Sequence, residues 1–260
     1  MLITSKDNPT IKTIHALLTQ ARLRKKLNQT VLEGVHLIDA YLNSNHLPLL
    51  VLVSESGLTH PEITPILSRL STTKLLTVDD TLYKHLRSLG ESLPIMALIK
   101  TPTPLLDHPL TTDCLIVNGV QDNGNLGTLL RTASAVGFDT IVCTTGTAQA
   151  WSPKTLRAGM GAQFSLNIYE NVSVTTLLTY LHLPCYATSS HADKLIYEHQ
   201  LCAPLALIMG HEGQGVDAEL LTHATPLALP QPNGQESLNV GVAGSVCLYE
   251  ILRQRQYAHS

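Results

Sequence analysis

The sequence predicts two successive α/β units, a smaller one over residues 1–104 and a larger one over residues 105–260. Three observations lead to this prediction. A chain of 260 residues with 44% hydrophobic composition can bury a substantial core. Short apolar runs alternate with helical patterns along the chain. The segment Thr101–Pro104, with two prolines, is typical of a linker and separates two groups of such runs.

The elements of the first unit begin with a helix. Asn8 before Pro9 combines a capping residue with a proline at the first helical position. Apolar residues then recur at helical spacing at Ile11, Ile14, Leu17, Leu18 and Ala21. The remaining runs predict strands at 31–34, 49–53, 74–78 and 95–99, with helices at 35–42 and 61–70.

The second unit is predicted from runs that are apolar throughout. They lie at 114–118, 140–144, 183–187, 205–209 and 226–230. Because these runs do not alternate with polar residues, both faces of each strand should be buried, as in a mostly parallel sheet covered by helices. A helix over about 238–255 ends the unit.

Positive charge is concentrated near the amino terminus, although the whole chain carries −3. Residues 1–26 hold six basic side chains against one acid, Asp7. The basic residues are Lys6, Lys12, Arg22, Arg24, Lys25 and Lys26. Such a patch can contact phosphates and would make binding to a nucleic acid salt-dependent. A solvated helix face is the alternative, and this pattern alone leaves both open.

Composition and spacing argue against several classes of protein. The five cysteines contain no CxxC pair, and the twelve histidines contain no HExxH spacing, so we predict buried free thiols and no metal site. No apolar run approaches the roughly 20 residues that span a bilayer, and the polar start lacks the apolar core of a secretory signal. We therefore expect a cytoplasmic protein.

Three loops rich in glycine or polar residues follow predicted strands, where open α/β sheets bind ligands. The loop and helix at 119–138 carry Asn125, a possible helix cap, and Arg131, whose guanidinium suits an anion. The loop at 210–216 has three glycines around Glu212. The loop at 229–244 places Ser237 and Asn239 at a helix entrance, where they could serve as caps or in function. Neither GxGxxG nor a Walker A sequence occurs in these loops, which weakens a nicotinamide or NTP assignment.

Taken in order, the three loops resemble the motifs of SpoU/TrmH-like RNA ribose 2′-O-methyltransferases of the SPOUT superfamily. The first motif matches at Asn125, Gly127, Arg131, Thr132, Ala133, Ala135 and Gly137. The second matches at Gly210, Glu212, Gly213 and Gly215, and the third at Ser237–Val240. Residues 152–162 are similar to the connecting stretch of this family, and the first unit is similar to its RNA substrate-binding domain, which is related to ribosomal proteins.

The resemblance implies a deep trefoil knot in the second unit, a homodimer formed through it, and S-adenosylmethionine as cofactor. It implies a reaction site formed by Asn125, Arg131, Glu212, Ser237 and Asn239. It implies cofactor contacts near Thr144, Met209, Gly210, Leu229 and Leu238, and RNA contacts by Lys12, Arg22, Arg24, Lys25 and Lys26. Ribosomal RNA is the first expectation and transfer RNA the second. Because aromatic residues are few, recognition through RNA shape and phosphates is favoured.

Two departures from the family pattern stand in the motifs. His211 occupies the place of an asparagine before Glu212, and the third motif has its glycine one position late, at Gly234. The arginine is often assigned as the base in this family. A guanidinium rarely loses its proton, so we expect Arg131 to grip a substrate phosphate and stabilise the developing alkoxide. A non-catalytic RNA-binding protein with this fold and a nucleotide-dependent Rossmann-type enzyme are the competing hypotheses.

Overall fold

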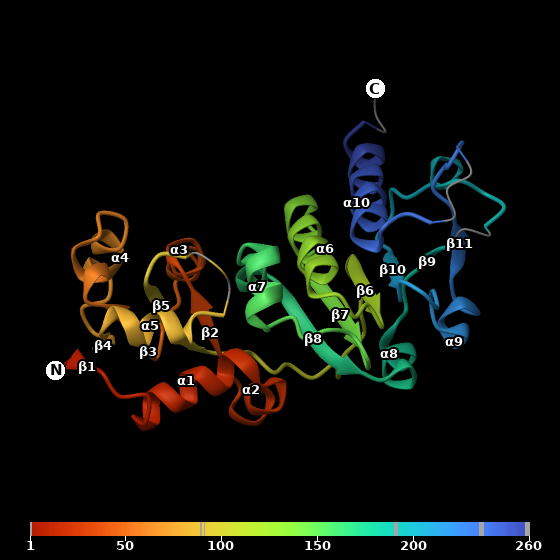
Figure 1. The fold of residues 1–260 in the computed structure, drawn as a ribbon. Helices are drawn as coiled ribbons and strands as arrows, with labels where there is room; N and C mark the ends of the chain where they lie inside the picture. Colours follow the sequence, from red (N-terminus) through yellow and green to blue (C-terminus); the bar gives the residue numbers. More distant parts are fainter. Residues whose placement is uncertain (1, 89, 91, 190–191, 234–236, 258–260) are drawn as a thin grey trace. The chain divides into compact units, whose positions relative to one another are not determined.

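The computed structural model describes residues 2–88, 90, 92–189, 192–233 and 237–257, which form two compact units (Figure 1). Unit 1 consists of residues 1–102 and 151–164, and unit 2 of residues 103–150 and 165–260. The first boundary between the units, after Pro102, falls within the predicted linker Thr101–Pro104. Residues 151–164, however, were expected in the second unit and instead pack within unit 1. A single boundary therefore does not divide this chain.

Unit 1 is a mixed five-stranded sheet with helices around it. Its strands are β1 (Leu2–Ile3), β2 (Gln29–Glu33), β3 (Leu50–Ser54), β4 (Lys74–Val78) and β5 (Ile95–Lys100), in the order β1-β4-β3-β5-β2. Strand β4 runs parallel to β1 and β3, whereas β5 runs antiparallel to β3 and β2. The helices are α1 (Pro9–Thr19), α2 (Ala21–Leu27), α3 (Val35–Asn43), α4 (Thr64–Ser68), α5 (Asp80–Leu86) and α7 (Pro153–Gly159), with a 3-10 turn η1 (Ser56–Thr59).

Helix α1 begins as the sequence predicts, because Asn8 Oδ1 accepts the backbone N–H groups of Thr10 and Ile11. Its apolar stripe of Ile11, Ile14, Leu17 and Leu18 is buried against β2, β3 and β4 in one core cluster. The predicted pattern continues to Ala21, but Gln20 takes an extended conformation and separates α1 from α2. Helix α5 was not predicted.

The segment 151–164 completes unit 1 beside the edge strand β2. Thr30 Oγ1, which is fully buried, donates a hydrogen bond of 2.8 Å to the carbonyl of Trp151. The rings of Tyr41 and Phe164 meet edge to face at 5.1 Å. Ser152 caps α7, with Pro153 at its first position. The stretch that resembles the connecting segment of the methyltransferases is thus part of the packing of unit 1.

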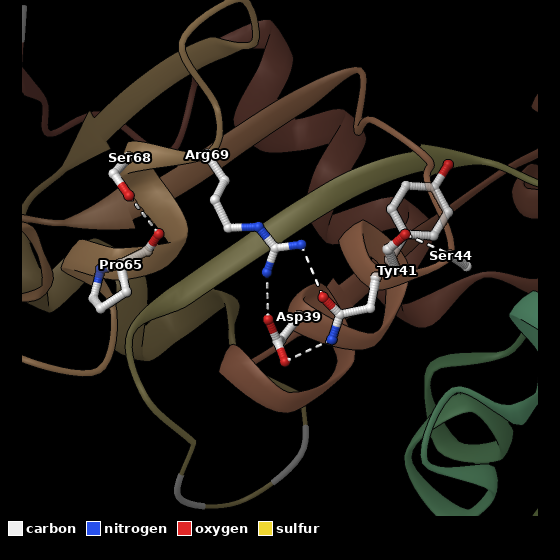
Figure 2. Close-up of polar contacts among 7 residues, drawn as sticks. Asp39, Tyr41, Ser44, Pro65, Ser68 and Arg69 are labelled. Atoms are coloured by element: carbon white, nitrogen blue, oxygen red, sulfur yellow. Dashed lines mark hydrogen bonds and ion pairs between the residues drawn. The ribbon is translucent and has the colours of Figure 1, made fainter.

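A polar cluster joins α3 to the end of α4 (Figure 2). Arg69 donates to Asp39 at 2.6 Å and to Asn43 at 2.9 Å, and Asn43 in turn donates to Asp39. Ser68 and Ser44 donate to the carbonyls of Pro65 and Tyr41 in nearby turns. The contacts of Arg69 therefore connect α3 with the end of α4 and occupy its guanidinium within unit 1.

Unit 2 is a parallel six-stranded sheet, which confirms the mostly parallel sheet predicted for it. Its strands are β6 (Cys114–Asn118), β7 (Thr140–Thr144), β8 (Asn167–Val172), β9 (Cys185–Thr188), β10 (Ala206–Gly210) and β11 (Thr225–Leu227), in the order β11-β9-β10-β6-β7-β8. The five pairings between neighbouring strands of this sheet are all parallel. Strand β8 was not predicted. The helices are α6 (Asn123–Val136), α8 (Val174–Tyr180), α9 (Ala218–Leu221) and α10 (Val240–Tyr257), with a 3-10 turn η3 (Ile196–Glu198).

Helices cover both faces of this sheet. In the view of Figure 1, α6 and α10 lie above it, and α8 and α9 lie below. Leu177 of α8 and Leu220 of α9 belong to the same buried cluster as Ile116 of the central strand β6. Above the sheet, α6 and α10 pack closely, and the Thr132 and Ser245 hydroxyls lie 2.9 Å apart. The carboxyl ends of β6 and β10 are therefore adjacent and overlaid by the first turns of α6 and α10.

The described chain contains no helix long and apolar enough to cross a membrane. Within the same residues, no group of three or more histidine, cysteine or acidic side chains is placed to hold a metal ion. All five cysteines are free thiols, and Cys202 alone is exposed.

Candidate functional site

A buried scaffold connects the carboxyl ends of the central strands. Asn118, the last residue of β6, donates through Nδ2 to Thr144 Oγ1 of β7 at 3.0 Å. Its Oδ1 accepts the N–H of Asp217, after the β10 loop, at 2.7 Å. Thr144 is only 2% exposed. The Thr144 side chain, expected near the cofactor, is thus engaged in holding the strand ends in register.

The first loop differs from its prediction in the identity of the cap. Asp122, and not Asn125, caps α6, because Asp122 Oδ1 accepts the N–H of Asn125 at 2.8 Å. Asn125 lies in the first turn, so its side-chain amide is available for other contacts. Sequence reasoning missed this because two Asx residues three positions apart offer equivalent capping signals.

The second loop brings Glu212 to the start of α6. Its carboxylate accepts hydrogen bonds from Asn125 Nδ2 at 3.1 Å and from the backbone N–H groups of Gln121 and Asp122 at 3.3 and 3.4 Å. Partial burial by itself raises the pKa of Glu212, but the hydrogen bonds from Asn125 and from backbone amides outweigh it, so the pKa is lowered. Glu212 is therefore an ionised acceptor at neutral pH.

The third loop adds Asn239, which uses both ends of its amide. Its Oδ1 accepts the N–H of Val242 at 3.1 Å and caps α10, while its Nδ2 donates to Asn125 Oδ1 at 2.8 Å. The predicted cap is therefore confirmed, and the same side chain contacts a residue of the first loop. Ser237 is exposed nearby and makes no hydrogen bond with the residues that the structure describes. Gly234, the displaced glycine, lies outside the described residues.

These contacts form one continuous network through all three loops. Asn239 donates to Asn125, and Asn125 donates to Glu212. The order of donation is fixed, because an ionised carboxylate only accepts. The network presents a defined row of amide and carboxylate groups at the carboxyl edge of a parallel sheet, where it can orient a polar ligand.

Arg131 stands apart from this network. At about 100° per residue, six positions place Arg131 roughly 240° around α6 from Asn125. Its side chain is exposed and has no hydrogen bond or ion pair with any residue that the structure describes. The guanidinium is thus free for an external anion but is not joined to Glu212 within one chain.

The expected cofactor residues occupy the loops around β10 and β11. Gly210 ends β10 against its own loop, and an added Cβ would lie 2.4 Å from Gly215 C and Val216 N. Met209 is fully buried, backbone included. Leu229 is half-buried and Leu238 exposed.

Gln231, in the third loop, was not predicted as a site residue. Its Oε1 is a buried acceptor without a partner in the described chain. The only signal in the sequence was that the loop departs from the family pattern at this point. An orphaned acceptor in such a loop fits a ligand that brings a hydrogen-bond donor.

The basic residues of unit 1 differ in their availability. Arg24 donates to the carbonyl of Leu17 at 2.8 Å and so caps the end of α1. Lys12 pairs with Asp7 at 2.7 Å on the surface. Arg22, Lys25 and Lys26 are exposed on α2. The free positive charge of this segment thus lies mainly on α2.

Comparisons with known proteins agree with this architecture. Residues 113–249 match the model of the SpoU rRNA Methylase family. The chain is 31% identical to the 23S rRNA (guanosine(2553)-2′-O)-methyltransferase RlmP of Bacillus subtilis, over 96% of this chain and 98% of that protein. A crystal structure of an RNA 2′-O ribose methyltransferase superposes with a TM-score of 0.83 at 31% identity, over 98% of this chain and all of that one. The SpoU methyltransferase AviRb from Streptomyces viridochromogenes, solved with AdoMet, shares the fold with a TM-score of 0.88 at 22% identity, over 96% and 99% of the two chains.

Proposed function

Because this chain belongs to the SpoU rRNA methylase family, we propose that it methylates a ribose 2′-hydroxyl of ribosomal RNA with S-adenosylmethionine as donor. The observation that carries the proposal is the network of Asn239, Asn125 and Glu212, which joins the three motif loops at one edge of the sheet. The rRNA substrate of the relative RlmP supports ribosomal over transfer RNA.

The residues at the strand ends fit an adenosyl cofactor. Backbone groups near Gly210, Leu229 and Leu238 would hold it, and the unpartnered acceptor Gln231 Oε1 suits the exocyclic amine of an adenine. When bound, S-adenosylmethionine supplies a methyl group on a sulfonium, which is transferred to oxygen as the carbon–sulfur bond breaks. Thr144 would act only indirectly, by holding the strand ends beneath the site.

The chain must then align the ribose hydroxyl and assist loss of its proton. Asn125 and Glu212 form a fixed polar surface that can orient the target nucleotide. Arg131 is exposed and can grip the phosphate beside the target ribose and stabilise the developing alkoxide. The proton would pass to that phosphate or to a neighbouring group, because a guanidinium is a poor base. Ser237 lies beside Asn239 and is the remaining candidate contact.

We propose that two copies associate through unit 2. Exposed apolar residues follow one another along α10 at Val242, Val246 and Tyr249, with Leu238 just before the helix. Burial of this stripe would remove an apolar surface from water. A partner subunit could bring its own Arg131 to the network, which would account for the separation of Arg131 from Glu212 in one chain.

We also propose the trefoil knot of this family for unit 2. The order of the elements supports this proposal. After the central strand β10 the chain forms the edge strand β11, and its last helix, α10, packs on α6 near the centre of the sheet (Figure 1). Unit 1 would bind RNA through the exposed Arg22, Lys25 and Lys26 of α2. With ribosomal RNA as substrate, we expect the protein in the cytoplasm.

The proposal is tested by titrating the purified protein with S-adenosylhomocysteine in a calorimeter and by assaying methylation of ribosomal RNA transcripts. We expect one site per chain and incorporation at a ribose 2′-oxygen. Binding without turnover on any ribosomal RNA would favour the non-catalytic alternative.

A conservative substitution tests the role of Arg131. Arg131→Lys keeps the positive charge but loses the bidentate grip, so we expect a strong loss of turnover. Retention of most activity at unchanged RNA affinity would refute the grip.

A further inference from the structure

We infer that His211 is a positioning residue, whose imidazole holds the loop that presents Glu212 to the first turn of α6. The inference rests on the proposed function for its effect on turnover. Its structural basis is independent of that function, because it depends only on contacts within the loop at 210–216.

The loop is closed at its base by a reciprocal backbone pair. His211 N donates to Gly215 O, and Gly215 N donates to His211 O, both at 2.9 Å. Three residues, Glu212 to Gln214, therefore turn the chain. The N–H groups of Gly213 and Gln214 point into this turn, toward the side chain of His211.

The ring of His211 supplies that acceptor. Its Nδ1 accepts the N–H of Gly213 at 2.9 Å and that of Gln214 at 3.1 Å. An Nδ1 that accepts carries no proton, so the neutral ring bears its proton on Nε2. The ring also lies beside Gly119, in the loop after β6. One side chain thus satisfies two backbone donors and sits between the first and second loops.

The consequence for Glu212 follows from its place in the turn. It lies between His211 and the two amides that the ring binds, and its carboxylate reaches Asn125, Gln121 and Asp122 at 3.1–3.4 Å. These bonds are near the long end of the normal range, so a small movement of the turn would break them. Loss of the Nδ1 acceptor should therefore weaken the whole network of the three loops.

The test uses two kinds of variant. His211→Phe keeps a ring of similar size without the acceptor, and His211→Ala removes the ring. His211→Asn restores an acceptor, because an asparagine Oδ1 can bond backbone N–H groups two and three residues on. The first measurement is amide hydrogen exchange at Gly213 and Gln214 by NMR, on the full chain without substrate. The second is kcat and KM on ribosomal RNA.

We expect exchange at both amides to rise at least tenfold in His211→Phe and His211→Ala, and to stay within threefold of wild type in His211→Asn. We expect kcat to fall at least tenfold in the first two variants, with KM within threefold, and to be rescued in His211→Asn. Unchanged exchange in both acceptor-free variants would overturn the inference, as would a His211→Asn enzyme as impaired as His211→Phe. If wild type methylates no ribosomal RNA, the proposed function fails while the exchange measurement still decides the role of His211.

Discussion

Replacement of Gly210 by alanine should displace the loop that carries Glu212. A Cβ at this position would meet Gly215 C and Val216 N at 2.4 Å and Gly215 O at 2.6 Å. All three are backbone atoms, so the loop would have to retreat by about 1 Å to reach ordinary contact distance. Overpacking of this kind costs roughly 3 kcal/mol, and the midpoint of thermal unfolding should fall by about 6 to 12 °C.

Gly213→Ala is the matched control in the same loop. Its added Cβ would lie 3.7 Å from the nearest atom of His211, which is ordinary contact. We expect its stability to stay within about 0.5 kcal/mol of wild type. Calorimetric unfolding and titration with S-adenosylhomocysteine would compare the two variants. Equal midpoints and equal affinities would refute the argument that the close backbone approach at Gly210 shapes the site.

Three further predictions concern unit 2. Because the pKa of Glu212 is lowered, its contribution to the stability of the folded state is complete at neutral pH and is lost only as the pH falls through that lowered pKa. NMR titration of the amides that bond its carboxylate should give a midpoint below the roughly 4.3 of a free glutamate. A midpoint above that value would contradict the network. Ellman's reagent should modify the exposed Cys202 quickly and the other four thiols slowly, because those four are buried. Burial raises the pKa of Cys185, for example, to about 11. Rapid reaction of several thiols in the native protein would contradict this prediction. Asp113→Ala should lower the unfolding free energy by about 2 kcal/mol, since Arg255 would lose a forked carboxylate partner; denaturant unfolding would detect this loss, and an unchanged midpoint would count against it.

The central strands could be predicted because both of their faces are buried. The runs at 114–118 and 140–144 have apolar centres, with polar residues only at their ends, and coincide with β6 and β7. Strand β8 could not be found in this way, since at the sheet edge its sequence includes Asn167 and Glu170 among the apolar residues. The break at Gln20 was also hidden, because the apolar spacing continues through it.

The site could be predicted as three loops but not as a network. Strand order and direction bring the loops to one edge, and the motif residues within them follow from the sequence. Which amide bonds which carboxylate depends on the exact turn of α6, and Asp122 rather than Asn125 proved to be the cap. Contacts such as that of Asn239 with Asn125 join residues far apart in the chain, which no local pattern can reveal.

The insertion of residues 151–164 into unit 1 bears on how the protein is made. During synthesis, Thr30 and Tyr41 leave the ribosome long before Trp151 and Phe164, their partners in unit 1. By the time those partners emerge, β6, α6 and β7 of unit 2 have emerged as well. Unit 1 therefore cannot complete its packing until part of unit 2 has been synthesised, and a fragment ending at Pro104 would lack the partners of Thr30 and Tyr41.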